Sequence, residues 1–567
     1  MSSSKSKTCS YTVLALAFAL LFLWVRPQYG GDSADYALKA YTYLTRPSLA
    51  STRALWEFGH LLWRPAAAAI AFAGGKTIPA WTHLDPSLIP LAALMALNAT
   101  FSLAAFLLIY RMGRGLSGSI AGGVVAFLFL TTNAVLTYLR SGYSYLPGLA
   151  MQLFAVNLIL VAPTASSPGR RAASNLGPRA FCLGASLALS IALWAPYIVT
   201  VPALIVLTPL WEKGGLARAE RLRLAALAAF WLAAISFFLF GGAILINRFQ
   251  SLGQVADWIR DSSHEWAQTR RLARLVTGLP RSLLSLRDET IMLKRLYLHD
   301  PYAPVTWKAI LAVAWKPPLF AAAMSSLGWI LSRTGEGRRL LIANLCAWIP
   351  LLVFAVAVFE PSAAERYLPG FALLFAALAY VAGRVPWRRP AAWILAAFFA
   401  AMPVVNLSAV SPAARKARDR SAIARLEAYA RVAKPDNVLV LLDFRDPIFR
   451  FQNVDPFHPL NRVSFRVVDA IEPGTLRGGR FRQIFAEEAG RAWRHGGDVW
   501  ISRRLVAPRP LPEWDWVEGD TPGVGWRDLS SYYRQFATDA ETGSEDGFLR
   551  IAASPENRLR LTAAIPR

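Results

Sequence analysis

The sequence predicts a polytopic α-helical membrane protein with about eleven transmembrane helices, followed by a C-terminal soluble domain of mixed α/β type. Three observations support this fold class. Of the 567 residues, 55% are hydrophobic, and the mean hydropathy is +0.35. The apolar residues form blocks of roughly 20, long enough to cross a bilayer and too continuous for barrel strands. From Ser411 onward the composition changes and no such block occurs.

The charge distribution supports a membrane location. The net charge is +25, from 61 Lys and Arg against 36 Asp and Glu. A basic chain can bind nucleic acid, but here much of the excess lies in short loops between apolar blocks. These loops read RMGR, GRR, EKGGLARAERLR, SRTGEGRR and GRVPWRR. This is the positive-inside pattern, so we expect the lipid bilayer as a partner and no nucleic acid.

The N-terminal part is expected to contain four spans and one long outer loop. The first span covers about residues 11–25, and we interpret it as retained because no small-residue cleavage site follows it. Residues 26–86 form the first outer loop, with one or two helices at the membrane surface. The next three spans are predicted at about residues 87–110, 120–138 and 146–161.

The stretch 180–210 allows two interpretations. It is apolar throughout and contains Pro196 and Pro202, and a proline within a helix kinks or breaks it. Two short spans would meet near Pro196, or one long kinked span would continue. The two-span interpretation keeps every basic loop on the inner side, whereas a single span would move the later basic loops outside, against the charge rule.

The remaining spans are predicted at about residues 224–246, 311–331, 340–359, 367–381 and 391–410. With eleven spans, the soluble domain of residues 411–567 lies on the outer face. Its first element is an amphipathic helix, RDRSAIARLEAYARVAKPDN, stopped near Pro435. The segments NVLVLLDF, RVSFRVVDAI and GDVWISRRLV are its predicted strands.

Ionisable residues gather in the first outer loop. Asp32 and Asp35 follow a Gly-Gly turn, and Glu57, His60 and Arg64 lie within eight residues of one another among aromatics. Such a cluster just outside a membrane span is costly to keep without a role. We therefore take the loop as the candidate active site.

Each of these residues also has a purely structural interpretation. Asp32 at a helix start is a good N-cap, and Asp35 in the first turn complements the helix dipole. His60 can equally be a buried histidine with satisfied hydrogen bonds. Arginines at span ends, such as Arg140 and Arg366, also snorkel to the interface.

The stretch Asp32–Ala40 resembles a pattern of the GT-C superfamily of membrane glycosyltransferases, Asp-Glu-x-x-Tyr-Ala-x-x-Ala. In members such as the protein O-mannosyltransferases and lipid A aminoarabinose transferases it follows the first span. Asp32 takes the catalytic position, and the tyrosine and both alanines match. Ser33 replaces the second acid, with Asp35 as a candidate substitute, which leaves any metal- or donor-specific role of that acid open.

Two further motifs extend the resemblance to about residues 11–410. EFGHLLWRP, residues 57–65, is similar to the family's first-loop segment, which has a histidine before an aromatic residue and a proline. ERYLPG, residues 365–370, is similar to the family's Arg-Tyr-x-x-Pro signature at the outer start of a late span. We find no motif of this kind in residues 411–567.

The resemblance implies a GT-C-like catalytic domain over residues 1–410, with its site outside. The Ala- and Arg-rich composition suggests a multi-pass protein of the bacterial inner membrane. It implies inverting transfer of a sugar from a polyprenyl-phosphate donor to a hydroxyl or similar acceptor on a glycan, lipid or protein. Asp32 would be the general base, with Asp35 next in line. The residues expected to bind substrate are Tyr36, Glu57, His60, Arg64, Arg140, Tyr143, Arg366 and Tyr367.

Other functions remain open at this point. No histidine shows metal-ligand spacing, and a divalent cation is left as an optional cofactor. A transporter or flippase for a lipid-linked substrate is the main alternative, favoured by the possible broken helix near Pro196. A membrane-anchored assembly factor is a third, but it leaves Asp32 unexplained.

Overall fold

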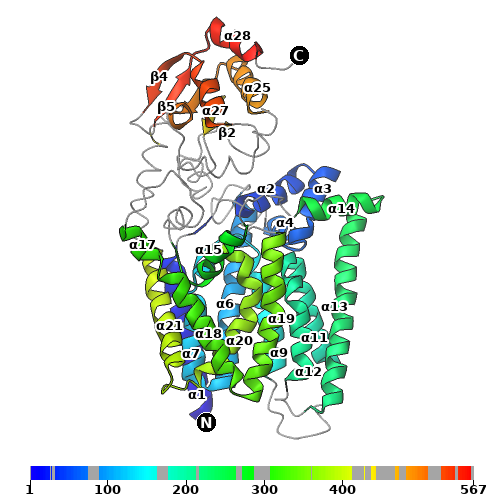
Figure 1. Ribbon diagram of the computed structural model, residues 1–567. Coiled ribbons are helices and arrows are strands. Elements are labelled where there is room, and N and C mark those ends of the chain that lie inside the picture. The colour runs from blue at the N-terminus through cyan, green and yellow to red at the C-terminus, as the bar shows by residue number, and fades with distance from the viewer. Residues whose placement is uncertain are drawn as a thin grey trace. The chain divides into compact units, whose positions relative to one another are not determined.

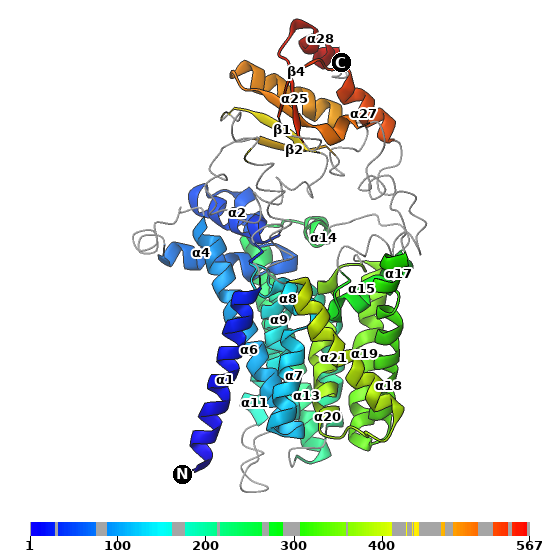
Figure 2. The same cartoon turned by 90° about the vertical axis from the view of Figure 1, so that its left-hand side faces the viewer.

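The computed structural model describes residues 2–25, 27–28, 32–74, 88–161, 176–211, 216–262, 271–286, 307–358, 361–410, 427, 434, 436–441, 466–470, 480–507, 525–542 and 547–563. These residues form two compact units, which divide the chain chiefly between residues 411 and 412. The first unit is helical, and the second contains a mixed sheet with helices (Figures 1 and 2).

In the helical unit the helices are α1 (Ser2–Trp24), α2 (Asp32–Thr45), α3 (Leu49–Leu55), η1 (Phe58–His60), α4 (Trp63–Gly74), α6 (Ile89–Ser117), α7 (Ser119–Leu130), α8 (Asn133–Tyr138), α9 (Tyr145–Leu160), α11 (Leu176–Leu193), η3 (Ala195–Val199), α12 (Val201–Leu210), α13 (Arg218–Ile246), α14 (Leu252–Asp261), α15 (Arg271–Leu283), α17 (Trp307–Val313), α18 (Lys316–Ser332), α19 (Gly335–Ala357), η5 (Ala364–Tyr367), α20 (Leu368–Ala382) and α21 (Pro390–Ala409). Each predicted span coincides with one of these helices or with two in succession. Within the described ranges, six helices are long and apolar enough to cross a membrane, and several apolar helices are shorter. The chain is a multi-pass helical membrane protein; the number of eleven spans stays a prediction.

Helix α13 shows how the unit meets lipid. Its side chains Phe237, Phe238 and Leu245 are 73%, 75% and 78% exposed on the surface of the unit. Large apolar side chains exposed along a 29-residue helix are unfavourable in water but match hydrocarbon. Helices α6, α7, α9 and α20, in contrast, contribute side chains to a continuous buried core.

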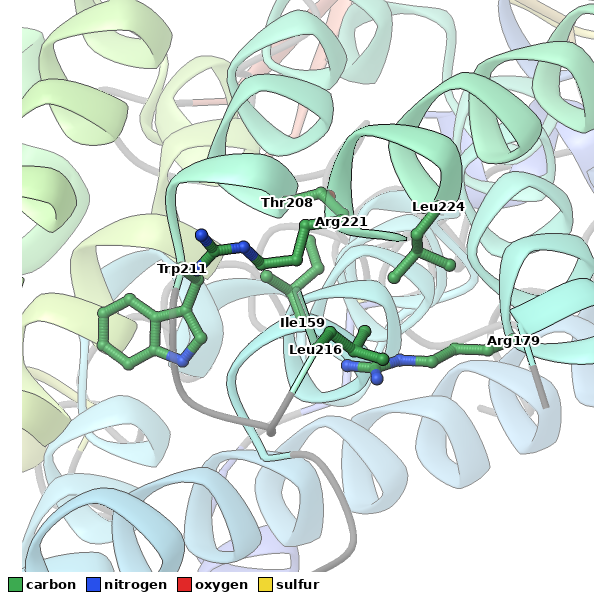
Figure 3. A pocket seen from close by; sticks show the side chains of 7 residues that line it. All are labelled: Ile159, Arg179, Thr208, Trp211, Leu216, Arg221 and Leu224. Atoms are coloured by element: carbon green, nitrogen blue, oxygen red, sulfur yellow. The ribbon is translucent and has the colours of Figure 1, made fainter. Parts of the chain in front are cut away.

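The chain reverses direction near Pro196, in agreement with the two-span interpretation. At the end of α11 the carbonyl of Ala192 accepts a hydrogen bond from the Leu62 amide at 3.0 Å. At the other end of these helices, Arg179 of α11 and Trp211 beyond α12 line one small cavity (Figure 3). The start of α11 and the end of α12 therefore meet, and η3 forms the turn between two antiparallel helices.

The two ends of the bundle differ in character. At one end, which we call the basic end, the segments 116–118, 333–335 and 383–389 come together. There the Arg384 guanidinium donates to the Leu116 carbonyl at 3.1 Å, and Thr334 bonds Tyr380 at 2.8 Å. At the other end, which we call the site end, lie α2–α4, residues 139–144 and residues 361–367 (Figures 1 and 2). Three of the basic loops predicted to share one side, RMGR, SRTGEGRR and GRVPWRR, therefore do so, while the orientation in a membrane stays a prediction.

Between α1 and α6 the predicted number of one or two helices was wrong. The described residues of this stretch form three short α-helices, α2, α3 and α4, and the 3-10 turn η1. Helix α3 begins at a capping box in which the side chains of Ser48 and Ser51 each accept from the other's amide, at 3.1 and 2.9 Å. Helices this short carry too little apolar periodicity for the sequence to reveal them.

The third predicted span is also interrupted. Helix α7 ends at Leu130, and the chain bends at Thr131 and Thr132 before α8 begins at Asn133. The Thr131 hydroxyl donates to the Phe127 carbonyl at 2.8 Å and so satisfies a helix-end acceptor. The break allows residues 139–144 to turn toward α2.

The second unit contains the strands β1 (Val438–Leu441), β2 (Arg466–Asp469), β3 (Val499–Ser502), β4 (Thr538–Thr542) and β5 (Phe548–Ile551) and the helices α25 (Arg480–Arg494), η8 (Arg503–Val506), α27 (Trp526–Arg534) and α28 (Pro555–Ala563). The sheet order is β2-β1-β3-β5-β4. Strand β1 pairs in parallel with β2 and β3, and β5 pairs antiparallel with β3 and β4. Strand β1 is entirely buried.

Each of the three predicted segments contains a strand. In the third segment, GDVWISRRLV, the strand covers only residues 499–502. RRLV after β3 forms the 3-10 helix η8 rather than strand. The amphipathic helix predicted over residues 418–437 lies largely outside the described residues. Helices α25 and α27 meet through aromatic contacts, with the ring centroids of Phe485 and Tyr533 5.1 Å apart.

Candidate active site

Asp32 is the first residue of α2 and lies among tyrosines. Its Oδ2 accepts a hydrogen bond from the Tyr145 hydroxyl at 3.0 Å and one from the Tyr36 hydroxyl at 3.3 Å. Among the described residues, no α2 amide donates to this carboxylate, and Oδ1 has no hydrogen-bond partner. Within the part of the chain that the structure describes, the Asp32 side chain therefore does not act as an N-cap of α2.

The Tyr36 hydroxyl is also part of a chain of hydrogen bonds through His60 to Ser144. The Tyr36 oxygen lies 2.7 Å from Nε2 of His60, and Nδ1 of His60 lies 2.8 Å from Oγ of Ser144. If Tyr36 donates its single proton to Asp32, then His60 Nε2–H must donate to Tyr36 and the Ser144 hydroxyl to Nδ1. His60 is buried, and its hydrogen bond fixes the position of the Tyr36 hydroxyl next to the Asp32 carboxylate.

The segment 139–144 is fixed against α2 by backbone contacts. The Gly142 amide donates to Oγ of Ser33 at 2.9 Å, and the Gly142 carbonyl accepts from Nε1 of Trp63 at 2.6 Å. A Cβ atom at Gly142 would lie 3.1 Å from Cβ of Ser33, so a larger residue would push the segment away. The Asn98 side chain donates to the Ser141 carbonyl at 2.9 Å. Serine at position 33 is thus a contact of this loop.

Tyrosines connect Asp32 to the ERY motif. The ring centroid of Tyr145 lies 4.9 Å from that of Tyr138 and 5.0 Å from that of Tyr143. The Tyr138 hydroxyl donates to Oε2 of Glu365 at 2.5 Å. Two motifs more than 300 residues apart in sequence therefore contribute carboxylates to one aromatic cluster.

Asp35, Glu57 and Arg64 form a separate ion-pair network. The Arg64 side chain is only 2% exposed and its guanidinium contacts the Glu57 carboxylate and, at 3.4 Å, Oδ2 of Asp35. It also donates to the Ala54 carbonyl at 2.6 Å. Asp35 is further paired with Lys39 at 2.8 Å. In this state the guanidinium of Arg64 is committed to the protein rather than open to a ligand.

The other predicted binding residues occupy different environments. The Arg140 guanidinium donates to the Val25 carbonyl at 2.9 Å and lies over the Phe22 ring, 4.9 Å from its centroid. Arg366 lies 3.7 Å from Glu365 and is 17% exposed. Tyr367 is fully buried, and its hydroxyl donates to the Pro361 carbonyl. Arg366 is linked to the tyrosine cluster through Glu365, which accepts a hydrogen bond from Tyr138.

Burial shapes the acid–base properties of the cluster. The pKa of Tyr36 lies well above its ordinary value, because burial and then the negative charges of Asp32 and Glu57 disfavour the phenolate. The pKa of Tyr143 is also raised, by burial and then by Asp32 and Glu365. Both tyrosines therefore stay neutral and can act as hydrogen-bond donors.

Sequence reasoning missed four residues of this site: Tyr138, Tyr145, Ser144 and Glu365. A signal existed for each of them. The segment YLRSGYSY, residues 138–145, repeats tyrosines directly after a span, and Glu365 begins the ERYLPG motif. No signal in the sequence indicates the break after α7, and this break turns the tyrosines toward Asp32.

Within the ranges that the structure describes, no group of three or more His, Cys, Asp or Glu is placed to hold a metal ion. The two carboxylates of the cluster, Asp32 and Glu365, each accept a tyrosine hydroxyl instead. A cation bound there would need further ligands from a substrate phosphate or from residues outside those ranges.

No protein-family model and no curated protein matches the sequence. Similar solved structures exist. The oligosaccharyltransferase of Archaeoglobus fulgidus is 14% identical, with a TM-score of 0.49 over 96% of this chain and 74% of that chain. ArnT from Cupriavidus metallidurans is 12% identical, with a TM-score of 0.48 over 100% of both chains. A second ArnT structure contains undecaprenyl phosphate.

The arabinofuranosyltransferase AftD from mycobacteria is also similar, with 14% identity and a TM-score of 0.42 over 96% of this chain and 40% of that chain. With every TM-score below 0.5, these likenesses assign no substrate, reaction or residue role. The resemblance of the chain to GT-C membrane glycosyltransferases therefore rests on its first-loop and ERYLPG motifs.

Proposed function

We propose that this protein transfers a sugar from a polyprenyl-phosphate donor to a hydroxyl acceptor at the site end of the helical unit. The observation that carries the proposal is the position of Asp32. Its carboxylate is oriented by two neutral tyrosine hydroxyls, with Oδ1 unbonded among the described residues. A carboxylate held in this way is suited to accept a proton from an incoming hydroxyl.

The proposed reaction is a single inverting displacement. The acceptor oxygen attacks C1 of the donor sugar while its proton passes to Asp32. The bond between C1 and the phosphate oxygen breaks, and the electron pair leaves with the polyprenyl phosphate. Tyr36 and Tyr145 keep the carboxylate in the required orientation, and positioned general bases of this kind typically contribute about 10²–10⁴-fold.

The leaving phosphate gains charge as the bond breaks, so a cation near the cluster would stabilise it. Arg366 is our first choice, because it adjoins Glu365 at the cluster and its side chain remains 17% exposed. Arg140 is the second, since one of its nitrogens is already occupied by the Val25 carbonyl. Arg64 is the least suitable because it is buried and paired with two carboxylates.

The main argument for the transporter alternative was a single transmembrane helix broken near Pro196. In the structure, η3 instead joins two antiparallel helices, α11 and α12, so this argument no longer applies. The ionisable cluster described here lies at the site end and not at the middle of the bundle, where transporters place their sites. A catalytic role for Asp32 accounts for this placement more directly.

The test uses full-length protein purified in lipid and a panel of polyprenyl-phosphate sugars with hydroxyl acceptors. Release of free polyprenyl phosphate is followed by mass spectrometry for wild type, Asp32→Asn and the control Asp257→Asn. Asp257 is 64% exposed on α14 and pairs only with nearby Arg260 among the described residues. We expect release from one donor, reduced at least 100-fold in Asp32→Asn and unchanged in the control.

Two results would count against the proposal in different ways. Undiminished release in Asp32→Asn would retain the enzyme but reject Asp32 as its base. Donor movement across the bilayer with intact sugar, equal in wild type and Asp32→Asn, would instead support the transporter.

A further inference from the structure

A second site candidate lies at the basic end, away from the tyrosine cluster. A cavity of about 220 Å³ opens between α18, α20 and the start of α21. Its polar lining consists of Arg333, Thr334, Tyr380, Arg384 and Arg389, and none of the described residues lining it is acidic. The volume is below the roughly 300–1,000 Å³ of typical small-molecule sites, so it suits a compact anionic group.

The guanidiniums are held in place by their neighbours. Arg333 stacks over the Trp329 ring at 4.3 Å, and Arg384 over the Tyr380 ring at 4.2 Å. Arg384 also donates to the Tyr380 carbonyl at 3.0 Å. An arginine that only extends to the water interface does not require contacts that hold its guanidinium in one position. A guanidinium that is already held in place loses little conformational entropy when it binds a phosphate.

Two helix starts add to the positive potential. Thr334 is the N-cap of the 23-residue helix α19, and Arg389 directly precedes α21. Helix N-termini carry partial positive charge and favour anions. Here they reinforce three arginines around an existing cavity.

The depth of the cavity matches the headgroup layer. Trp387 and Trp393 lie beside Arg389 in sequence, are 54% and 62% exposed, and have ring centroids 5.5 Å apart. Exposed tryptophans at a span end mark the membrane–water interface. Basic pockets between spans at this level bind the headgroups of anionic lipids.

We propose that this cavity binds the headgroup phosphate of an anionic phospholipid from the leaflet at the basic end. Arg333 and Arg389 would contact the phosphate, and Arg384 would complete the positive wall. The Thr334–Tyr380 hydroxyl pair would hydrogen-bond the phosphate or the headgroup. This binding is independent of the reaction proposed for the other end.

The experiment is native mass spectrometry of full-length protein in detergent, titrated with phosphatidylglycerol and with phosphatidylcholine. The test variant is Arg333→Gln with Arg389→Gln. The control is Arg338→Gln with Arg388→Gln. It removes two exposed arginines that do not line the cavity, one in the first turn of α19 and one in the loop before α21. We expect wild type and control to retain one tightly bound phosphatidylglycerol, and the test variant to bind it about 30-fold more weakly.

The variant Arg333→Lys with Arg389→Lys keeps both charges and should recover most of the affinity. Equal phosphatidylglycerol affinity in test and control variants would overturn the proposal, as would equal affinity for phosphatidylcholine in the wild type. Displacement of the lipid by millimolar glycerol 3-phosphate would show that a soluble phosphate ester, and not a lipid, is the ligand. Size-exclusion profiles of all variants verify that they remain folded.

Discussion

Replacing Arg64 with methionine should destabilise the helical unit at the site end rather than weaken donor binding selectively. Arg64 is 2% exposed, and its guanidinium joins the Glu57 carboxylate, the Ala54 carbonyl and, over a 4.8 Å distance, the Tyr36 ring. Methionine fills a similar volume but leaves Glu57, which is 12% exposed, as a nearly buried charge without its cation.

The size of the loss follows from this burial. Removing one partner of a buried ion pair costs about 3–5 kcal/mol, chiefly because the other charge remains buried. The contact with Asp35 adds little, because that carboxylate is 44% exposed and keeps Lys39. We therefore expect a loss of about 3 kcal/mol.

Thermal unfolding of the purified protein measures this loss, with the double variant Glu57→Gln and Arg64→Met as the matched comparison. Glutamine removes the stranded charge, so the double variant should be more stable than Arg64→Met alone. An Arg64→Met protein that unfolds like the wild type but shows a much higher KM for the donor would refute this reasoning. That outcome would make Arg64 a phosphate ligand.

Two predictions concern the tyrosines. Tyr145→Phe removes a hydrogen bond to a charged group, worth about 1.5–3 kcal/mol, so kcat in the release assay should fall about tenfold or more; an unchanged kcat would show that this contact does not orient Asp32. The raised pKa of Tyr36 means that the folded protein keeps a proton which the unfolded chain releases near pH 10. Its contribution to stability is present below that pH and is lost as the pH rises above about 10. Unfolding midpoints between pH 8 and 11 should therefore fall less steeply in Tyr36→Phe, and equal slopes would contradict the assignment.

The fold class was predictable because lipid imposes a simple rule on sequence. Apolar blocks of sufficient length must be helices, and charge placement between them reports their direction. The same rule decided between the two interpretations around Pro196. The breaks at Thr131–Thr132 and the short helices α3 and α4 were not predictable, because they depend on local hydrogen bonds such as those between Ser48 and Ser51.

The site was predictable in outline but not in its connections. Motifs placed Asp32, His60 and Arg366 in one region, since Asp32 and His60 lie in the first outer loop and Arg366 lies at the outer start of a late span. Their partners depend on how segment 139–144 packs against α2, which no local pattern encodes. The ion-pair network of Arg64 was likewise invisible, because a buried structural arginine and a phosphate-binding arginine look the same in sequence.

The two acids at the start of α2 illustrate how partners divide roles between neighbouring residues. Asp35 accepts from Lys39 at 2.8 Å and from Arg64 at 3.4 Å, and these cations compete with any incoming hydroxyl. Asp32 is approached by neutral hydroxyls only, among the described residues. We therefore expect Asp35→Asn to retain most of the turnover while losing some stability, and Asp32→Asn to lose turnover while unfolding normally. The reverse pattern in the release and unfolding assays would transfer the base to Asp35 and assign Asp32 to the helix cap.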